Sequence, residues 1–175
     1  RAFLRSRLTL GGEMAEIISD VNKLVARDTT ETSQFVTLFY LEIDHERKAF
    51  QWVRAGHDPA ILYDPDKDEF LEMRGPGAAL GITPDFMFEA SEALPVETGG
   101  ILTVGTDGIW ETMSPEGELF GKERLKDLIR RNAARTADRI LKAILRELSE
   151  FRRGRFRDDD VTMVVIKAVK NTRQG

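Results

Sequence analysis

The chain has 175 residues, the size of one domain, and 41% of them are hydrophobic, enough for a sizeable core. Its formal net charge of −4 disfavours a nucleic-acid-binding protein, whose footprint is usually a basic surface. The absence of cysteine excludes disulfides and thiolate metal sites and is compatible with a reducing compartment. No apolar run reaches the roughly 18 residues that a membrane-spanning helix needs. We therefore expect a cytoplasmic protein with no membrane segment in this chain.

The first part of the chain has the pattern of two helices. Residues 2–8 resemble the middle of an amphipathic helix, with no capping residue before them. Gly11 and Gly12 interrupt this segment. A second helix is predicted from about residue 13 to residue 27, because its apolar residues recur at spacings of three and four. The chain also begins with Arg1 rather than Met, so we expect it to be incomplete at its N-terminus.

The middle of the chain changes to segments rich in Val, Ile, Thr, Phe and Tyr that are separated by turn residues, the pattern of antiparallel hairpins. The segment 101–105 is short and apolar without alternation, so we expect it to be buried on both faces. We predict strands over residues 35–44, 48–55, 60–63, 69–73, 101–105 and 161–169, and a weak strand over 86–90.

Two further helices are predicted before the last strand. One covers residues 122–132, and a longer one begins after Thr136, whose hydroxyl can cap its first turn. Blocks of strands and paired helices predict an α+β fold, an antiparallel β-sandwich flanked by paired helices. We expect a single domain over residues 1–170 and a C-terminal tail over 171–175.

Acidic residues follow one predicted strand and precede another. The turn Thr106-Asp107-Gly108 comes directly after the strand 101–105, and Asp158, Asp159 and Asp160 come directly before the last strand. If these are adjacent, central and antiparallel strands, the carboxylates converge and suit Mg²⁺ or Mn²⁺. The residues alone also permit a simple turn former and a solvated acidic loop.

Five motifs in order decide between these alternatives. They resemble the successive motifs of the SpoIIE-type branch of the metal-dependent (type 2C) protein Ser/Thr phosphatases, and the resemblance covers nearly the whole chain. The motifs are Phe35-Val36-Thr37-Leu38-Phe39, Ala55-Gly56-His57-Asp58-Pro59, Leu80-Gly81-Ile82, Thr106-Asp107-Gly108-Ile109-Trp110-Glu111 and Asp159-Asp160-Val161-Thr162.

The resemblance implies a catalytic mechanism. Two Mn²⁺ or Mg²⁺ ions share a bridging water, which attacks the phosphorus of a phosphoserine or phosphothreonine without a phosphoenzyme. Asp107 and Asp159 would each supply a carboxylate to the metals, Gly108 would allow close backbone approach, and Thr162 would brace the turn. The implied substrate is a phosphorylated anti-sigma-factor antagonist of a bacterial signalling pathway, and such domains usually follow a sensory or receiver module.

Two motifs of that family do not occur in this sequence. They are a Gly-Asp-aromatic-x-Asp strand and a Gly-Asp-x-x-Gly-x-Gly turn, which supply the aspartate that bridges the metals. We expect both to precede Arg1 in the parent protein. The chain alone should then bind metal weakly and show little activity, because Mg²⁺ demands correct octahedral geometry and two carboxylates without the bridging one should hold it poorly.

Other residues are weaker candidates. His57 could contact substrate or act as an acid, although a structural hydrogen bond is an equal alternative. Arg153 and Arg155 belong to a basic loop that could attract a phosphoprotein or could be an ordinary surface loop. Asp64, Asp66 and Asp68 have the spacing of an EF-hand start but lack its glycine and glutamate, so we expect a hairpin turn.

Three functions remain after the sequence analysis. The leading one is a phosphatase domain. The second is a non-catalytic partner-binding module with the same fold, and the third is a sensor or adaptor domain of unrelated fold. The sequence leaves the oligomeric state open, with a homodimer as one option.

Overall fold

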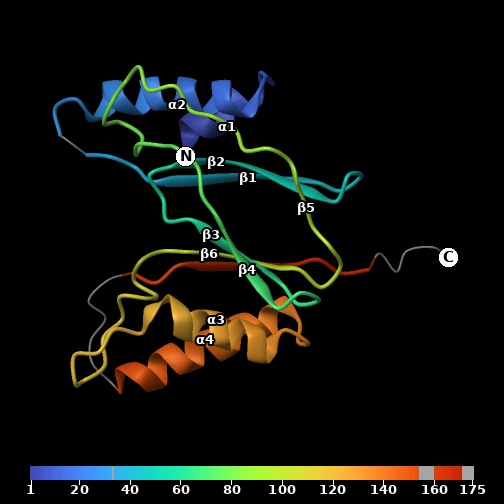
Figure 1. Cartoon of the computed structure of the whole chain (residues 1–175). Helices are drawn as coiled ribbons and strands as arrows, with labels where there is room; N and C mark the ends of the chain where they lie inside the picture. Colours follow the sequence, from blue (N-terminus) through green and yellow to red (C-terminus); the bar gives the residue numbers. More distant parts are fainter. Residues whose placement is uncertain (33, 154–159, 171–175) are drawn as a thin grey trace. The chain divides into compact units, whose positions relative to one another are not determined.

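The computed structural model describes residues 1–32, 34–153 and 160–170. Its contacts form two compact units, the first comprising Arg1–Pro59 and Arg74–Pro95, and the second Ala60–Met73 and the chain from Val96 onward. Each unit contains an antiparallel sheet and a pair of helices (Figure 1). The α+β class and the order of elements are therefore confirmed. No helix within the described ranges is long and apolar enough to cross a membrane.

Unit 1 contains two N-terminal helices and a three-stranded sheet in the order β1-β2-β5 (Figure 1). Both helices lie where periodicity predicts them, although the second helix continues two residues beyond its predicted end. The elements are α1 (Ala2–Leu8), α2 (Met14–Thr29), β1 (Leu38–Asp44), β2 (Ala49–Ala55) and β5 (Leu94–Pro95).

The core of unit 1 forms between the apolar face of α2 and one face of its sheet. Its buried members are Met14, Ile17, Ile18, Val21, Val53, Ala55, Leu80 and Phe88. Asn22 is fully buried on the same helix, where its amide donates to the carbonyls of Thr83 and Pro84 and accepts from the amide of Gly81. These three hydrogen bonds fix the irregular segment after β4 to α2, because a buried amide without partners is strongly destabilising.

The predicted strand at residues 86–90 is wrong. This segment is irregular, and the short strand β5, a few residues later, pairs with β2 on the side opposite β1. The backbone amide of Phe88 is satisfied by the hydroxyl of Ser19 on α2, at 3.1 Å, instead of by a neighbouring strand. Phe88 is buried in the core of unit 1, so its hydrophobicity reflects burial in a loop rather than a strand.

Unit 2 contains a four-stranded antiparallel sheet in the order β4-β3-β6-β7, and α3 and α4 lie along one face of it (Figure 1). The predicted strands and helices of this unit are present, with ends that differ by one or two residues. The elements are β3 (Ala60–Asp64), β4 (Glu69–Met73), β6 (Ile101–Gly105), α3 (Gly121–Asn132), α4 (Ala137–Arg152) and β7 (Met163–Lys167).

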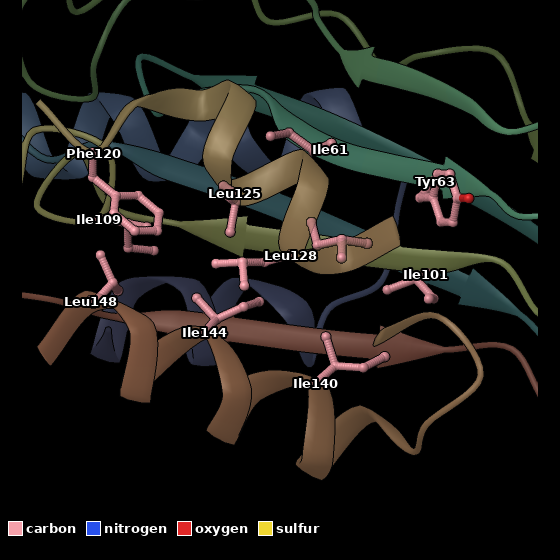
Figure 2. Close-up of a cluster of buried hydrophobic side chains, with 11 residues drawn as sticks. Ile61, Tyr63, Ile101, Ile109, Phe120, Leu125, Leu128, Ile140, Ile144 and Leu148 are labelled. Carbon is pink, nitrogen blue, oxygen red and sulfur yellow. The ribbon is translucent and has the colours of Figure 1, made fainter. Parts of the chain in front are cut away.

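The core of unit 2 fills the space between these two helices and the sheet, as Figure 2 shows. Full burial of a side chain such as Ile140 or Ile144 stabilises the unit by about 1.5–3 kcal/mol. As predicted, the hydroxyl of Thr136 caps α4 by accepting from the amide of Arg139. Lys167 of β7 donates to the carbonyls of Ala133 and Arg135, at 2.6 and 2.8 Å, which ties the strand to the end of α3.

The expected adjacency of the strands at 101–105 and 161–169 is confirmed, since β6 pairs with β7 in antiparallel register with Gly105 opposite Met163. The expectation that both are central is wrong. Only β6 is interior, while β7 is the last strand in the order that the described residues form. An unbroken apolar sequence indicates burial but not position, and β7 gains its burial on one face from α4 and the core of unit 2.

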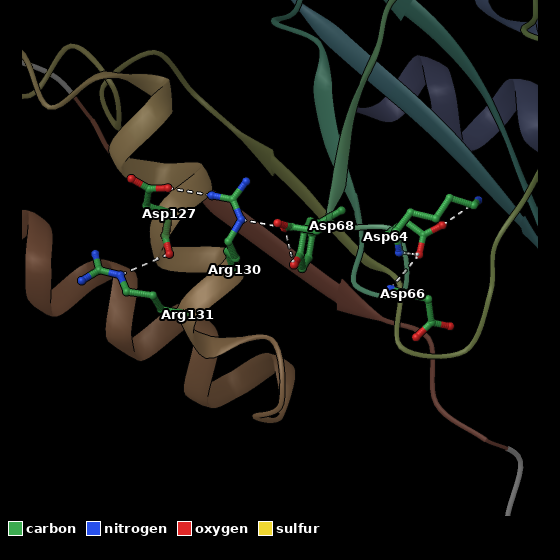
Figure 3. Close-up of polar contacts among 8 residues, drawn as sticks. Asp64, Asp66, Asp68, Asp127, Arg130 and Arg131 are labelled. Carbon is green, nitrogen blue, oxygen red and sulfur yellow. Dashed lines mark hydrogen bonds and ion pairs between the residues drawn. The ribbon is translucent and has the colours of Figure 1, made fainter.

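The Asp-rich segment 64–68 forms the turn of the β3–β4 hairpin, as predicted (Figure 3). Asp64 accepts from the amides of Asp66 and Lys67 within the turn, and Asp68 pairs with Arg130 of α3 at 2.6 Å. Arg130 also bonds Asp127 at 2.7 Å, and the hydroxyl of Tyr63 donates to Asp68 at 2.9 Å. These carboxylates therefore fasten the hairpin to α3, and within the described ranges they form no metal cluster.

Replacement of Asp68 by Asn tests this attachment. Both residues tolerate the left-handed backbone of position 68, where φ is +56°, so the change removes charge without straining the turn. Hydrogen bonds from Arg130 and Tyr63 hold the pKa of Asp68 below its usual range. The stabilisation is therefore present above the unfolded-state pKa and is lost as pH falls through the folded-state pKa.

Chemical unfolding should show Asp68→Asn less stable than wild type at pH 7, with the difference shrinking as pH falls below ~4 and vanishing below the lowered folded-state pKa. The matched control is Asp66→Asn in the same turn, which should show no such difference. A pH-independent deficit in Asp68→Asn would contradict an ion-pair origin.

Candidate active site

The candidate site lies where β6 ends and β7 begins. The ladder between these strands places Gly105 opposite Met163, and the next residues continue the pairing because the amide of Thr106 donates to the carbonyl of Thr162 at 3.1 Å. The acidic turn after β6 and the residues just before β7 therefore lie side by side in unit 2. A site built from both segments requires that they lie this close together.

The hydroxyl of Thr106 links the two segments further. It donates to the carbonyl of Asp160 at 3.1 Å and accepts from the amide of Thr162 at 3.1 Å. One side chain thus satisfies two backbone groups beyond the end of the ladder, where a strand would otherwise leave them without partners. Thr106 thereby fixes the start of β7 against the turn that carries Asp107.

The turn itself is compact and well supported. The amide of Ile109 donates to the carbonyl of Thr106, and that of Glu111 to the carbonyl of Asp107. Ile109 is buried beneath the turn, and a Cβ at Gly105 would lie 2.4 Å from its Cδ1. A side chain at position 105 would therefore force the buried side chain of Ile109 to shift.

Asp107 is exposed at the tip of this turn, and its Oδ1 accepts from the amide of Gly108 at 3.0 Å. Asp160, on the segment just before β7, is also exposed. Asp159 lies outside the described residues, so its predicted role stays a prediction. The oxygen donors present are of the kind that Mn²⁺ and Mg²⁺ prefer, but no three acidic or histidine side chains within the described ranges converge on one point.

His57 lies in unit 1, in the turn between β2 and β3. Its ring Nδ1 is 3.2 Å from the hydroxyl of Thr37, and its carbonyl accepts from the guanidinium of Arg54 at 2.8 Å. The structural hydrogen bond expected for this histidine is therefore present, and the ring is partly exposed. A role in substrate contact stays a prediction.

Arg153 is described, whereas Arg155 lies outside the described residues. Arg153 ends α4 and pairs with Glu116 at 3.1 Å. A hollow of about 270 Å³ at this position is lined by Ser114, Glu116, Glu118, Glu147, Glu150, Phe151 and Arg153. The surrounding carboxylates weaken the attraction of Arg153 for a phosphate group.

Trp52 and Trp110 each make packing contacts within their own unit. The indole nitrogen of Trp52 donates to the carbonyl of Arg74 at 2.9 Å within unit 1. Trp110 packs against the core of unit 2, and the ammonium of Lys122 lies 4.6 Å from its ring centre.

Sequence reasoning missed the roles of Thr106, Thr37 and Arg54. The first two stand in quoted motifs, but their hydroxyls act across 54 and 20 residues of chain, which local patterns do not reveal. The role of Thr106 could have been suspected from its place between a buried strand and an aspartate. A threonine hydroxyl at a strand end can replace a hydrogen bond of the sheet. For Arg54 the strand pattern gave no indication.

The chain belongs to the SpoIIE family. Its model, Stage II sporulation protein E, matches residues 1–169. Among curated relatives, Protein IcfG of Synechocystis sp. is 28% identical over 83% of this chain and 22% of its own length. Phosphoserine phosphatase RsbU of Bacillus subtilis is 24% identical over 87% of this chain and 44% of its own length. The chain thus spans less than half the length of these relatives.

Solved structures show the same fold. The SiaA-PP2C domain of Pseudomonas aeruginosa matches with a TM-score of 0.81 and 19% identity, over 95% of this chain and 66% of that one. RsbX in complex with magnesium matches with a TM-score of 0.63 and 17% identity, over 94% of this chain and 70% of that one. A PP2C-like fold with two antiparallel sheets and helices is therefore established, and the hypothesis of an unrelated fold is wrong.

Replacement of Thr106 by Val tests the link between the two acidic segments. Valine keeps the shape but neither accepts from the amide of Thr162 nor donates to the carbonyl of Asp160. Loss of one such hydrogen bond costs about 1 kcal/mol, so exchange of the Thr162 amide should accelerate about fivefold or more.

Amide hydrogen exchange measured by NMR checks this expectation. Thr106→Ser retains the hydroxyl and should leave protection of Thr162 close to that of wild type. Equal protection in wild type and Thr106→Val would show that the hydroxyl does not hold the two segments together.

Proposed function

We propose that the protein carrying this chain is a metal-dependent phosphatase that hydrolyses phosphoserine or phosphothreonine on a bacterial regulatory protein. The family membership identifies a SpoIIE/RsbU-type serine phosphatase domain of bacterial signalling. The reaction, metal, site residues and substrate of this particular protein are parts of the proposal.

The observation that carries the proposal is the hydrogen-bonded junction between the ends of β6 and β7. It places the exposed Asp107 beside the segment that begins with Asp160 and holds both by the hydroxyl of Thr106. Backbone pairing and a buried support are what a rigid carboxylate site requires, since loosely held ligands lose metal affinity.

Asp107 and Asp159 would hold Mn²⁺ or Mg²⁺, and the backbone of Gly108 would approach it closely. When bound, such a cation neutralises charge that develops on a transferred phosphoryl group and lowers the pKa of a coordinated water. The task of the chain's own residues is to orient the carboxylates. The hydrogen bond from the amide of Gly108 to Oδ1 of Asp107 restricts that side chain, and no hydrogen bond to its Oδ2 is found from the described residues.

A phosphorylated protein of the anti-sigma-factor-antagonist type is the proposed substrate, and a sensor or receiver module elsewhere in the protein is the proposed regulator. The name of the relative RsbU, phosphoserine phosphatase, supports the reaction class. The greater length of the relatives leaves room for a regulatory part. A homodimer and a cytoplasmic location are further parts of the proposal.

A non-catalytic partner-binding module with this fold is the second candidate. It would use the same fold to bind a partner without a metal site. The two candidates differ in one property, because only the phosphatase needs the charge of Asp107 and Asp159.

Replacement of Asp107 or Asp159 by Asn therefore tests the function in the protein that carries this chain. Each change keeps side-chain volume and removes a charged oxygen ligand, so Mn²⁺-dependent hydrolysis of a phosphoserine protein should fall at least about 100-fold. Circular dichroism and the unfolding midpoint should stay close to wild type, because Asp107 is exposed.

Glu111→Gln is the matched control, since it removes a carboxylate one turn further along the same segment and should retain activity. Full activity in Asp107→Asn would exclude its role as a ligand. A wild-type protein with no Mn²⁺-dependent hydrolysis, but with unchanged partner binding in the mutants, would support the non-catalytic module.

A further inference from the structure

Positive charge is concentrated on one short segment of unit 2. Residues 131–146 contain five cationic side chains and one acidic side chain, so they carry a formal charge of +4 in a chain whose net charge is −4. All five cations are exposed. We call these side chains the basic ridge: Arg131, Arg135, Arg139, Lys142 and Arg146. The rest of the chain is therefore more acidic than its net charge suggests.

Three members of the ridge lie on one face of α4. Arg139, Lys142 and Arg146 follow one another at spacings of three and four residues, which places them side by side on a helix. This face points away from the one that buries Ile140 and Ile144 in the core of unit 2. With a rise of 1.5 Å per residue, the three side chains cover about 10 Å along the helix.

The ridge continues around the corner between α3 and α4 (Figure 1). Arg131 lies in the last turn of α3, and Arg135 comes just before the residue that caps α4. The ammonium of Lys167 adds a further positive charge at this corner, because it donates to the carbonyls of Ala133 and Arg135 at 2.6 and 2.8 Å. The corner and the exposed face of α4 thus form one continuous cationic surface.

Much of this charge is not neutralised by the chain itself. Among the described residues, no carboxylate lies within ion-pair distance of Arg131, Arg135 or Arg139. Lys142 and Arg146 pair with carboxylates one turn away on α4, at 2.9 and 3.8 Å, but exposed pairs of this kind contribute little to stability. In addition, Arg139 lies in the first turn of α4, where the helix dipole disfavours a cation. Folding of unit 2 therefore does not account for the ridge.

We propose that the basic ridge is a docking surface for an acidic segment of a partner protein. The inference goes beyond the proposed phosphatase function and does not depend on it, because it concerns binding to a part of unit 2 that carries none of the proposed metal ligands.

The chemistry of the surface favours a protein segment as the occupant. Arginine guanidinium groups bind carboxylates through two parallel hydrogen bonds, so a row of them matches a row of Glu or Asp side chains. Leu145 borders the ridge on α4 and is 41% exposed, which offers an apolar contact to a side chain of the same segment. An extended chain rises about 3.3 Å per residue, so about four residues reach from Arg139 to Arg146.

Two other anionic partners fit the surface less well. Residues 131–146 contain no aromatic side chain on which a nucleic-acid base would stack. Leu145 is the one large apolar side chain of α4 that is clearly exposed, whereas a helix that lies on a membrane buries a whole apolar face. These differences make nucleic acid and anionic lipid alternative outcomes of the test.

The α3–α4 corner of the ridge is separate from the candidate active site. Lys167, which contacts this corner, pairs with Ile101 at one end of the β6–β7 ladder, while Gly105 and Met163 pair at the other end, next to Asp107. A ladder of five residue pairs is about 13 Å long. A segment docked at the corner would therefore bind at the opposite end of the sheet from the acidic junction.

Binding of an acidic peptide to this chain tests the proposal. The probe is a fluorescein-labelled peptide of four Glu-Glu-Leu repeats, and its anisotropy is measured at low salt, about 50 mM, where screening is weak. Replacement of Arg135, Arg139 and Arg146 by Gln in one variant should weaken binding at least about fivefold, because three exposed charge contacts are lost. Unchanged binding would overturn the proposal.

The matched control removes three exposed cations from unit 1, by Arg5→Gln, Lys23→Gln and Arg47→Gln together. It changes the net charge by the same amount and should leave the affinity within about twofold of wild type. Equal weakening in the two triple variants would show that the peptide senses only net charge, and would also overturn the proposal.

A single substitution separates loss of binding from loss of folding. Arg139→Glu replaces a cation in the first turn of α4 by an anion, which the helix dipole favours, so the unfolding midpoint should be at least that of wild type. The same variant should bind the peptide more weakly than Arg139→Gln does. Peptide affinity equal to wild type in Arg139→Glu would contradict docking at the ridge.

The location and the class of partner are tested on ¹⁵N-labelled chain. The peptide should shift the amide signals of residues 131–146 first, and a peptide with Gln in place of Leu should bind about threefold more weakly because it loses the contact with Leu145. Shifts centred elsewhere would refute the assignment. Tighter binding of a 12-nucleotide single strand or of phosphatidylserine vesicles at the same residues would replace the protein segment by that partner.

Discussion

Antiparallel pairing between β6 and β7 is the constraint on which the candidate site depends. These strands are separated by 57 residues that include both helices of unit 2, and their register is fixed with Gly105 opposite Met163. The helices pack on the sheet through fully buried Ile140 and Ile144, which holds the two strands in place from one side. Because side chains alternate along a strand, a slip of one residue would reverse every side chain at the junction. Asp107 and Asp160 can share a site only in this register.

In unit 1, the close approach of two backbone segments fixes the turn at His57. The turn at His57 has no ladder of its own, and glycines at positions 56 and 77 let a second segment pack directly against it. Arg54 then supplies hydrogen bonds to both segments. Small residues and an arginine in this unit thus lie at contact points between segments.

Local patterns predicted much of the fold. The helix at α2 and the strands β2, β3 and β6 followed from spacing and composition, and the cap at Thr136 followed from hydrogen-bonding chemistry. The position of β7 at the edge of the sheet could not be predicted from its sequence. Apolar residues indicate that a strand is buried, but they do not show whether one or two strands pair with it. The error at residues 86–90 has a similar origin. There the side chain of Ser19, distant in sequence, satisfies a backbone amide.

The candidate site was predictable only in part. Asp107 was found from its place at a strand end, and its pairing with the second acidic segment was expected and is present for residues 160–162. Asp159 was assigned through the family resemblance, and its position lies outside the described residues. The hydroxyls of Thr106 and Thr37 act on segments far away in sequence, so their roles required the three-dimensional arrangement.

Paramagnetic broadening by Mn²⁺ tests most directly whether the junction of β6 and β7 binds the metal. It needs no substrate and detects weak binding, and Mn²⁺ prefers oxygen donors such as those of Asp107. Titration of this chain with Mn²⁺ should broaden the amide signals of residues 106–108 and 160–162 before any others. In Asp107→Asn, these signals should no longer broaden first. Broadening that begins instead at the acidic turn 64–68 or beside Glu116 and Glu147 would contradict the account.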